Sequence, residues 1–388
     1  MTEGSTSNRS FLMFLRNRYL FVDLLRAAAL SAMTGMTVFN TFLSPDYNGE
    51  FFFRLLHYAI SLAAPAFMVI SGFVFVVSSQ GRLDELRRFS GYSRHKLWRI
   101  ALILLVAYSI HLPFFSFRTM LTQASPSDIK NIYNVDVLQC IAAGLLILLA
   151  GRRLTKSDRI FRFFTITMSL VFTLPAPFLW NTDFSRFIPL PLACYFNEIH
   201  GSHFPLFPWA GFIFAGATLA VYYLKARETF NEKDFIRKLS IFGITSYLIC
   251  FIIISVVNRY AWFQLDPSPL FFLERFGVIT LLLCACWLYY RRTGAEAGFF
   301  VDAGRQSLVV YWLHLQIITS RLWNGRSLSA IAGGTLGIAE CLIATFILLA
   351  AMMTTAHVWG IIKQDNPGLA KKIFLTTICG SVILFLIR

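Results

Sequence analysis

Residues 55–78 read LLHYAISLAAPAFMVISGFVFVVS and contain no Asp, Glu, Lys or Arg. A run of about 20 predominantly apolar residues can cross the hydrocarbon core of a bilayer as a helix. Comparable stretches occur near residues 20–43, 98–117, 133–150, 162–180, 205–224, 239–257, 269–290, 306–322, 329–355 and 372–387. We therefore predict an all-α fold, a polytopic membrane bundle of about eleven transmembrane helices.

The composition supports this class. The chain has 388 residues, of which 56% are hydrophobic and 14% are charged. Soluble domains are about 45–50% apolar and about 25% charged, so a soluble enzyme, a disordered chain and a disulfide scaffold are excluded. The seven cysteines form no CxxC pair, and we expect most of them to be small buried residues. No signal-peptide cleavage site stands out. We expect residues 1–19 to be a cytoplasmic tail and residues 20–388 to be a single multi-pass domain.

The positive charge indicates an orientation. The formal net charge is +15, and Lys and Arg cluster in alternate connections between the apolar stretches. With the N-terminus in the cytoplasm, the inside segments exceed the outside segments in Lys and Arg by roughly three to one. Cations in such loops face anionic lipid. We therefore expect a lipid bilayer, and no nucleic acid, as the partner of this charge.

Two charged residues lie in the first apolar stretch. Asp23 and Arg26 are three residues apart, which places them on one face of a helix. One interpretation is a pair that neutralises itself near the cytoplasmic interface, with Arg26 reaching toward water. The other is a carboxylate that holds a guanidinium for a phosphate or carbonyl ligand. The spacing alone leaves both open.

Asn40 and His57 lie near the outer ends of the first two predicted helices. The segment 44–54 between them is short enough to bring these ends together. A neutral imidazole beside an amide, at the water edge of a bundle, suits proton abstraction near neutral pH. The structural alternatives are a helix cap or an interhelical hydrogen bond for Asn40 and a helix-end role for His57.

Further polar residues lie at membrane depth, where such residues are functional candidates. They are Asp136 and Gln139 in the fourth predicted helix, Trp209 after Pro205 and Pro208 in the sixth, Glu274 and Arg275 in the eighth, and His314 in the ninth. A hydrogen bond to a neighbouring helix explains His314 as well as a site does. His200 and His203 share one loop, but two histidines without further ligands are a weak metal signal. We predict no metal site.

Five segments, in order along the chain, resemble the heparan-α-glucosaminide N-acetyltransferase-like family of membrane acyltransferases. Arg18 to Arg26, followed by Met33 and Asn40, is similar to the family's opening Asp-x-x-Arg-Gly helix. The other four segments are Pro65 to Gly72, Val137 to Ala142, Phe204 to Trp209 and Ser307 to His314. The chain departs from the pattern at Ala27, where the family has Gly, and at Cys140, where it has Arg.

The resemblance implies an acyl donor, acetyl-CoA or another acyl-CoA, that reaches the bundle from the cytosol. It also implies a sugar acceptor on the far side and an outer-face His and Asn at the reaction centre. By position these are His57 and Asn40. We expect substrate and cofactor binding from Asp23, Arg26, Gln139, Trp209, Arg275 and His314.

We accordingly predict a multi-pass enzyme, in a bacterial cytoplasmic (inner) membrane, that acylates an amino or hydroxyl group of an extracytoplasmic glycan or glycolipid. The alternative is a transporter or flippase for a glycan or lipid intermediate, with Asp23, Arg26, Glu274 and Arg275 along its path. A weaker third interpretation is a non-catalytic membrane scaffold. A homodimer stays open as the assembly.

Overall fold

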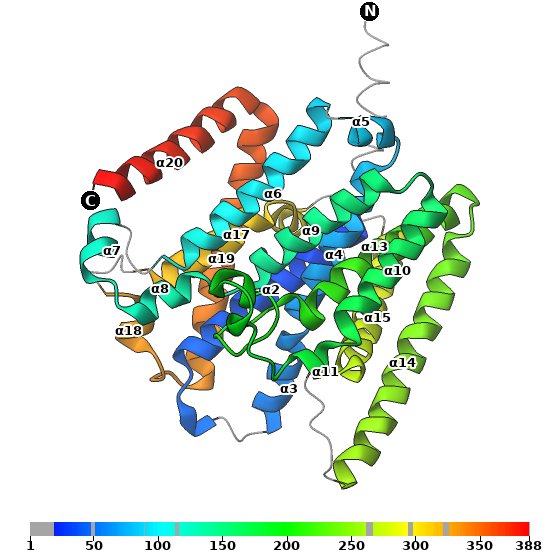
Figure 1. Ribbon diagram of the computed structural model, residues 1–388, viewed down its shortest axis with the longest axis horizontal. Coiled ribbons are helices and arrows are strands. Elements are labelled where there is room, and N and C mark those ends of the chain that lie inside the picture. The colour runs from blue at the N-terminus through cyan, green and yellow to red at the C-terminus, as the bar shows by residue number, and fades with distance from the viewer. Residues whose placement is uncertain are drawn as a thin grey trace, which may run out of the picture. The chain divides into compact units, whose positions relative to one another are not determined.

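The computed structural model describes residues 19–47, 51–88, 90–112, 116–260, 267–293, 298–320 and 326–387. Among these residues the regular structure is helical, apart from an isolated β-bridge between Leu43 and Leu336 (Figure 1). The prediction of an all-α fold is confirmed. The helices are α2 (Leu20–Phe42), α3 (Phe51–Ser61), α4 (Ala63–Ser79), α5 (Leu83–Arg87), α6 (Gly91–Ile110), α7 (Phe117–Gln123), α8 (Pro126–Ile132), α9 (Val137–Leu154), α10 (Asp158–Thr173), α11 (Ala176–Leu179), α12 (Leu190–Ala193), α13 (Leu206–Glu228), α14 (Glu232–Tyr260), α15 (Pro269–Thr293), α16 (Phe299–Arg305), α17 (Ser307–Thr319), α18 (Leu328–Ala332), α19 (Ile338–Asp365) and α20 (Pro367–Ile387), with short 3-10 turns η1 (Pro45–Tyr47) and η2 (Phe184–Arg186).

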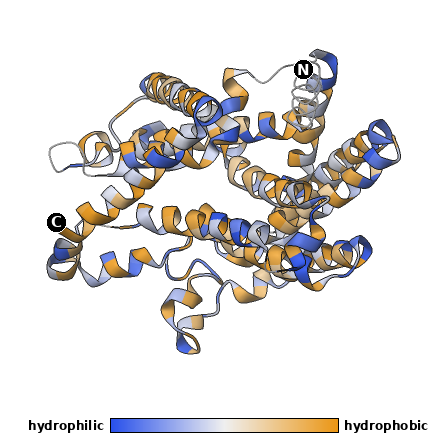
Figure 2. Cartoon of the chain, turned by 90° about the horizontal axis from the view of Figure 1, so that it is seen from above, coloured by the Kyte–Doolittle hydropathy of each residue, from blue (hydrophilic) through white to orange (hydrophobic). Residues whose placement is uncertain are grey.

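Eight helical segments among the described residues are long and apolar enough to cross a membrane. They are α2, the segment Leu56–Ser79 of α3 and α4, α9, α13, the segment Glu232–Val256 of α14, α15, α19 and α20. Figure 2 shows hydrophobic residues predominating along the helices. The chain is a multi-pass membrane protein.

The other three predicted transmembrane helices correspond to α6, α10 and α17. The first half of α6 carries Arg94, Lys96 and Arg99, while α10 and α17 have 16 and 13 residues. That these three helices cross the membrane stays a prediction. The total of eleven spans, the cytoplasmic N-terminus and the single multi-pass domain stay predictions with it.

The predicted span 98–117 overlaps α6, which starts earlier because of a cap and ends earlier, at Ile110. The apolar stretch predicts residues 98–117, but α6 begins at Gly91. The Ser90 hydroxyl accepts a hydrogen bond from the Ser93 backbone N–H at 3.3 Å, which satisfies one of the free N–H groups of the first turn. Hydropathy misses the first two turns because they are polar.

Glycine and proline shift two further bounds. The predicted span 329–355 is divided between α18 and α19, because Gly333 and Gly334 end the first helix, with Gly334 at a φ of 68°. α19 then continues to Asp365. The predicted span 162–180 ends early, at Thr173, because Pro175 cannot donate a hydrogen bond within a helix interior.

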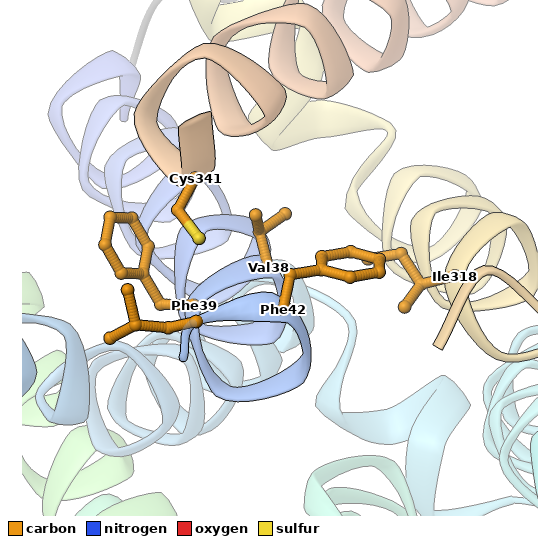
Figure 3. Close-up of a cluster of buried hydrophobic side chains, with 6 residues drawn as sticks. Val38, Phe39, Phe42, Ile318 and Cys341 are labelled. Carbon is orange, nitrogen blue, oxygen red and sulfur yellow. The ribbon is translucent and has the colours of Figure 1, made fainter. Parts of the chain in front are cut away.

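The chain folds into two compact units, each described separately below. Unit 1 comprises Met1–Ala63 and Leu281–Ala370, and unit 2 comprises Ala64–Thr280 and Lys371–Arg388. In unit 1, α2 packs against α3, α16, α17 and α19. Part of its core is the cluster Val38, Phe39, Phe42, Leu43, Ile318 and Cys341. In Figure 3 the labelled side chains of this cluster come from α2, α17 and α19.

Unit 2 is organised around α13, which packs against α9, α10 and α14. α4 and α13 approach so closely that a side chain at either of two glycines would strike backbone. A Cβ at Gly72 would lie 1.8 Å from the Ile213 carbonyl oxygen, and a Cβ at Gly216 would lie 1.9 Å from that of Val69. Small residues at such a crossing are typical of membrane helix pairs.

Candidate functional site

The two predicted catalytic residues belong to unit 1 and are exposed. Asn40 lies in the last turn of α2, and no hydrogen bond joins its side chain to another described residue. His57 lies on α3, next to Leu56, which packs against the cluster drawn in Figure 3. α2 and α3 are in contact. Neither side chain is therefore part of the packed core of unit 1, and their role in catalysis stays a prediction.

His314 on α17 is buried, with 1% of its surface exposed. Its Nδ1 lies 2.9 Å from the Val310 carbonyl oxygen. A carbonyl only accepts, so Nδ1 donates to it, and Nε2 lies 3.5 Å from the Thr37 hydroxyl of α2, which itself donates to the Met33 carbonyl at 3.0 Å. This geometry matches the hydrogen bond to a neighbouring helix that the sequence leaves open. A role for His314 in substrate binding stays a prediction.

The expected Asp23–Arg26 pair forms, and it is part of a larger network in unit 1. Arg26 Nη1 lies 3.4 Å from Asp23 Oδ1, and Arg305 Nε on α16 lies 3.3 Å from Asp23 Oδ2. Arg305 also lies 3.6 Å from Asp302, whose other oxygen is 2.9 Å from His357 Nδ1 on α19. These five side chains, the inner network, tie together three helices.

The inner network sits where α2 and α16 nearly touch. A Cβ at Gly304 would lie 2.3 Å from the Asp23 carbonyl oxygen. The side chains of Asp23, Arg26 and Arg305 are only 14–21% exposed. Each of the two carboxylates lies between two basic groups, which explains the cohesion of the network. Beyond the polarity of residues 302–306, nothing in the sequence points to the Asp23–Arg305 contact.

In unit 2 the predicted residue Gln139 is fully buried near the start of α9. Its Oε1 accepts a hydrogen bond from the Asp136 backbone N–H at 3.2 Å, and its Nε2 has no hydrogen-bond acceptor among the described residues. An unsatisfied buried donor costs about 1–3 kcal/mol. Asp136 faces His111, a residue that sequence reasoning missed, with Oδ2 3.0 Å from Nε2.

Trp209 lies in the first turns of α13, after the irregular entrance that the two prolines predict. Phe207 has the non-helical angles φ −99° and ψ 117°. The Trp209 ring contacts Phe204 and Phe271 at centroid distances of 4.7 and 5.5 Å, and its Nε1 is buried without an acceptor among the described residues. The aromatic contacts hold the indole in place, and its N–H is a further donor.

Backbone hydrogen bonds bring the starts of α9 and α13 together. The Phe204 N–H donates to the Val135 carbonyl at 2.9 Å, and the Val135 N–H donates to the Ser202 hydroxyl at 3.0 Å. Further along, a Cβ at Gly144 would meet the Ile213 side chain at 2.5 Å. Gln139 and Trp209 precede this contact by five and four residues, so they lie at a similar level on adjoining helices.

Arg275 on α15 is held by a ring and by its neighbour. Its guanidinium carbon lies 3.8 Å from the centre of the Phe271 ring, and its Nη1 lies 3.6 Å from Glu274 Oε2. Both charged side chains are less than 20% exposed. The cation–π contact lowers the cost of keeping the guanidinium out of water.

The loop histidines separate. His200 pairs with Asp183 at 3.1 Å, and His203 is exposed. The hydrogen bond from the Ser185 hydroxyl, with smaller help from His200, lowers the pKa of Asp183 below its usual value. Among the described residues, no group of three or more His, Cys, Asp or Glu side chains could hold a metal ion.

The comparisons with known proteins place this geometry in a family. No curated protein matches the chain. A family model described as heparan-alpha-glucosaminide N-acetyltransferase, catalytic, matches residues 18–255. Asp23, Arg26, Asn40, His57, Gln139 and Trp209 lie within the match, and Arg275 and His314 lie outside it. Because the match spans more than half of the chain, the protein belongs to the heparan-alpha-glucosaminide N-acetyltransferase family and is an acetyltransferase-type membrane enzyme.

Proposed function

We propose that the protein transfers an acyl group, most simply acetyl, from cytosolic acyl-CoA to an amino or hydroxyl group of an extracytoplasmic glycan or glycolipid. The observation that carries the proposal is the family match over residues 18–255 together with eight apolar helices that could cross a membrane. A catalytic-domain match gives no support to the alternative of a transporter or flippase. We place the enzyme in a bacterial cytoplasmic membrane with its N-terminus inside.

In the proposed reaction His57 accepts the proton of the acceptor amine or hydroxyl as its nitrogen or oxygen attacks the thioester carbonyl carbon. The carbon–sulfur bond breaks, and the CoA thiolate leaves and takes up a proton. Asn40 donates an amide N–H to the oxyanion that forms on the carbonyl oxygen. The accessibility of both side chains supports these roles.

The remaining predicted residues bind substrate or cofactor in this proposal. Arg26, held by Asp23, serves the phosphates or carbonyls of acyl-CoA from the cytosolic end. Gln139 and Trp209 offer buried N–H donors in unit 2. Arg275 and His314 complete the set, and both have well-defined neighbours in the structure.

The test uses the purified full chain in lipid nanodiscs with radiolabelled acetyl-CoA and glucosamine or glucose as acceptor. We expect thiol release coupled to acetylation of the sugar, and a loss of about 10²–10⁴-fold in the His57→Ala variant. His95→Ala is the matched control, because His95 is also exposed on a helix but lies in the predicted cytoplasmic half of α6. Wild-type turnover in His57→Ala would remove His57 from the mechanism.

A second measurement separates enzyme from transporter. The protein is reconstituted in vesicles with acetyl-CoA on one side only and the acceptor on the other. Acetylated sugar on the acceptor's side supports transfer across the bilayer. Counterflow of unmodified sugar without any thiol release would contradict the proposed function.

A further inference from the structure

A histidine–carboxylate pair lies where α6 ends and α9 begins, in unit 2. His111 follows the last residue of α6, Asp136 immediately precedes α9, and Nε2 of the histidine lies 3.0 Å from Oδ2 of the aspartate. The two atoms are in contact, but their approach lies outside hydrogen-bond geometry. The two side chains are 16% and 25% exposed. They are shielded from bulk water but reachable.

This pair differs from the other two histidine–aspartate pairs among the described residues. Asp183 in the His200 pair is 33% exposed, and His357 in the Asp302 pair is 40% exposed. The His111 pair is the one in which both members are at least three-quarters covered. Partial burial strengthens the electrostatic hold of a carboxylate on an imidazole.

A buried hydrogen-bond donor stands beside the pair. Gln139 is 0% exposed. The hydrogen bond that its Oε1 accepts from the Asp136 N–H assigns the oxygen and nitrogen positions of the side-chain amide. Nε2 therefore points its N–H groups away from that bond, and no described residue accepts from them. A fully buried donor of this kind is what a ligand carbonyl or hydroxyl oxygen satisfies.

The backbone around the pair is fixed by other contacts. The Tyr108 hydroxyl, one turn before His111 on α6, lies 3.0 Å from the Tyr195 hydroxyl. Val135, next to Asp136, is hydrogen-bonded to Ser202 and Phe204. A site whose backbone is fixed by such hydrogen bonds keeps its geometry better than a site on an unsupported loop.

We propose that His111, Asp136 and Gln139 form an acceptor subsite in unit 2. Asp136 lies against one side of the His111 ring, and the other ring nitrogen forms a hydrogen bond with an amino or hydroxyl group of the acceptor. Gln139 donates a hydrogen bond to an oxygen of the acceptor. This inference rests on the proposed function, adds His111 and Asp136 to it, and assigns Gln139 to the acceptor.

The experiment measures initial rates with glucosamine as the varied acceptor at saturating acetyl-CoA, and then with acetyl-CoA varied. We expect His111→Ala and His111→Gln to lower kcat/KM for glucosamine at least 10-fold while the KM for acetyl-CoA is unchanged. Added imidazole should restore part of the lost rate in His111→Ala. Gln139→Leu should raise the KM for glucosamine with a smaller effect on kcat.

The controls keep the outcomes distinct. His200→Ala removes the imidazole of a more exposed pair in the same unit and should behave as wild type. Asp136→Asn preserves the side-chain shape at the start of α9, and Asn also caps helices well. A loss of activity in that variant is therefore due to the missing charge and not to a disturbed helix start. If both His111 variants and Gln139→Leu keep the wild-type kinetic constants, the subsite is wrong. If the wild-type protein transfers no acetyl group, the proposed function is wrong. The subsite can still be tested in that case, by comparing the thermal shift that glucosamine causes in wild type and in His111→Gln.

Discussion

The two units hold their polar residues in different ways. In unit 1 the inner network joins residues from α2, α16 and α19 that are as many as 334 positions apart, from Asp23 to His357. In unit 2 the described charged pairs join residues at most 25 positions apart, from His111–Asp136 to Glu274–Arg275, and the helix backbones approach most closely at Gly72 and Gly216. Unit 1 should therefore respond most to loss of charge, and unit 2 to gain of volume.

The largest expected effect is the loss of Arg305. Arg305→Ala removes the cation that two partly buried carboxylates, Asp23 and Asp302, share, and losing charged partners of this kind costs about 3 kcal/mol in total. We expect the free energy of unfolding to fall by about this amount in SDS titration. Arg326→Ala, an exposed arginine of the same unit, is the control. A loss no larger than that of the control would show that the inner network is not a stabilising feature of unit 1.

A smaller effect is expected at the crossing in unit 2. Gly72→Ala places a Cβ against the Ile213 carbonyl, and relieving such a contact by shifting backbone costs about 1–3 kcal/mol. Gly380→Ala is the control, because a Cβ there meets nothing within 4 Å and a helical Gly→Ala change stabilises by up to about 1 kcal/mol. The same unfolding titration applies. If the two variants change the free energy of unfolding equally, the proposed difference between the units is wrong.

A weak effect is expected at the exposed end of the inner network. His357 is 40% exposed, so His357→Ala should cost less than about 1 kcal/mol. A double variant with Arg305→Ala should cost less than the sum of the two, because both remove partners of Asp302. Strict additivity would mean that the network does not act as a unit.

The smallest effect concerns the Asp183 loop in unit 2. The pKa of Asp183 is lower in the folded protein than its usual value, chiefly through the Ser185 hydroxyl. A depressed carboxyl pKa stabilises the fold above about pH 4 and loses this contribution as the pH falls further. Limited proteolysis of the loop should therefore accelerate below about pH 4 in wild type and show a weaker pH dependence in Asp183→Ala. An unchanged profile would contradict the prediction.

The sequence predicts the fold class well because membrane crossing depends on local composition. Residues 55–78 and 269–290 are recognised from their own apolarity, and both are helical in the structure. The start of α6 could not be read from hydropathy because Ser90 caps the helix well before the apolar stretch begins. The 329–355 span is wrong because two glycines end a helix in the middle of this apolar stretch.

The site is less predictable because its contacts cross long stretches of chain. The Asp23–Arg26 pair follows from a spacing of three, but Arg305 lies 282 positions from Asp23 and no local pattern links them. Likewise His111 meets Asp136 only because α7 and α8 bring the chain back between them. The sequence does single out Gln139 by its polarity within an apolar run, but it does not show that Oε1 is bound and Nε2 is not.

The short length of α17 has a consequence for the surrounding lipid. At about 1.5 Å per residue, its 13 residues span about 20 Å, roughly 10 Å less than the hydrocarbon thickness of a typical bilayer. A membrane-crossing segment that falls short in this way makes the bilayer thin locally or tilts its neighbours. If α17 crosses as predicted, the distance between the two aqueous compartments is shorter along α17 than along its longer neighbours α2 and α19.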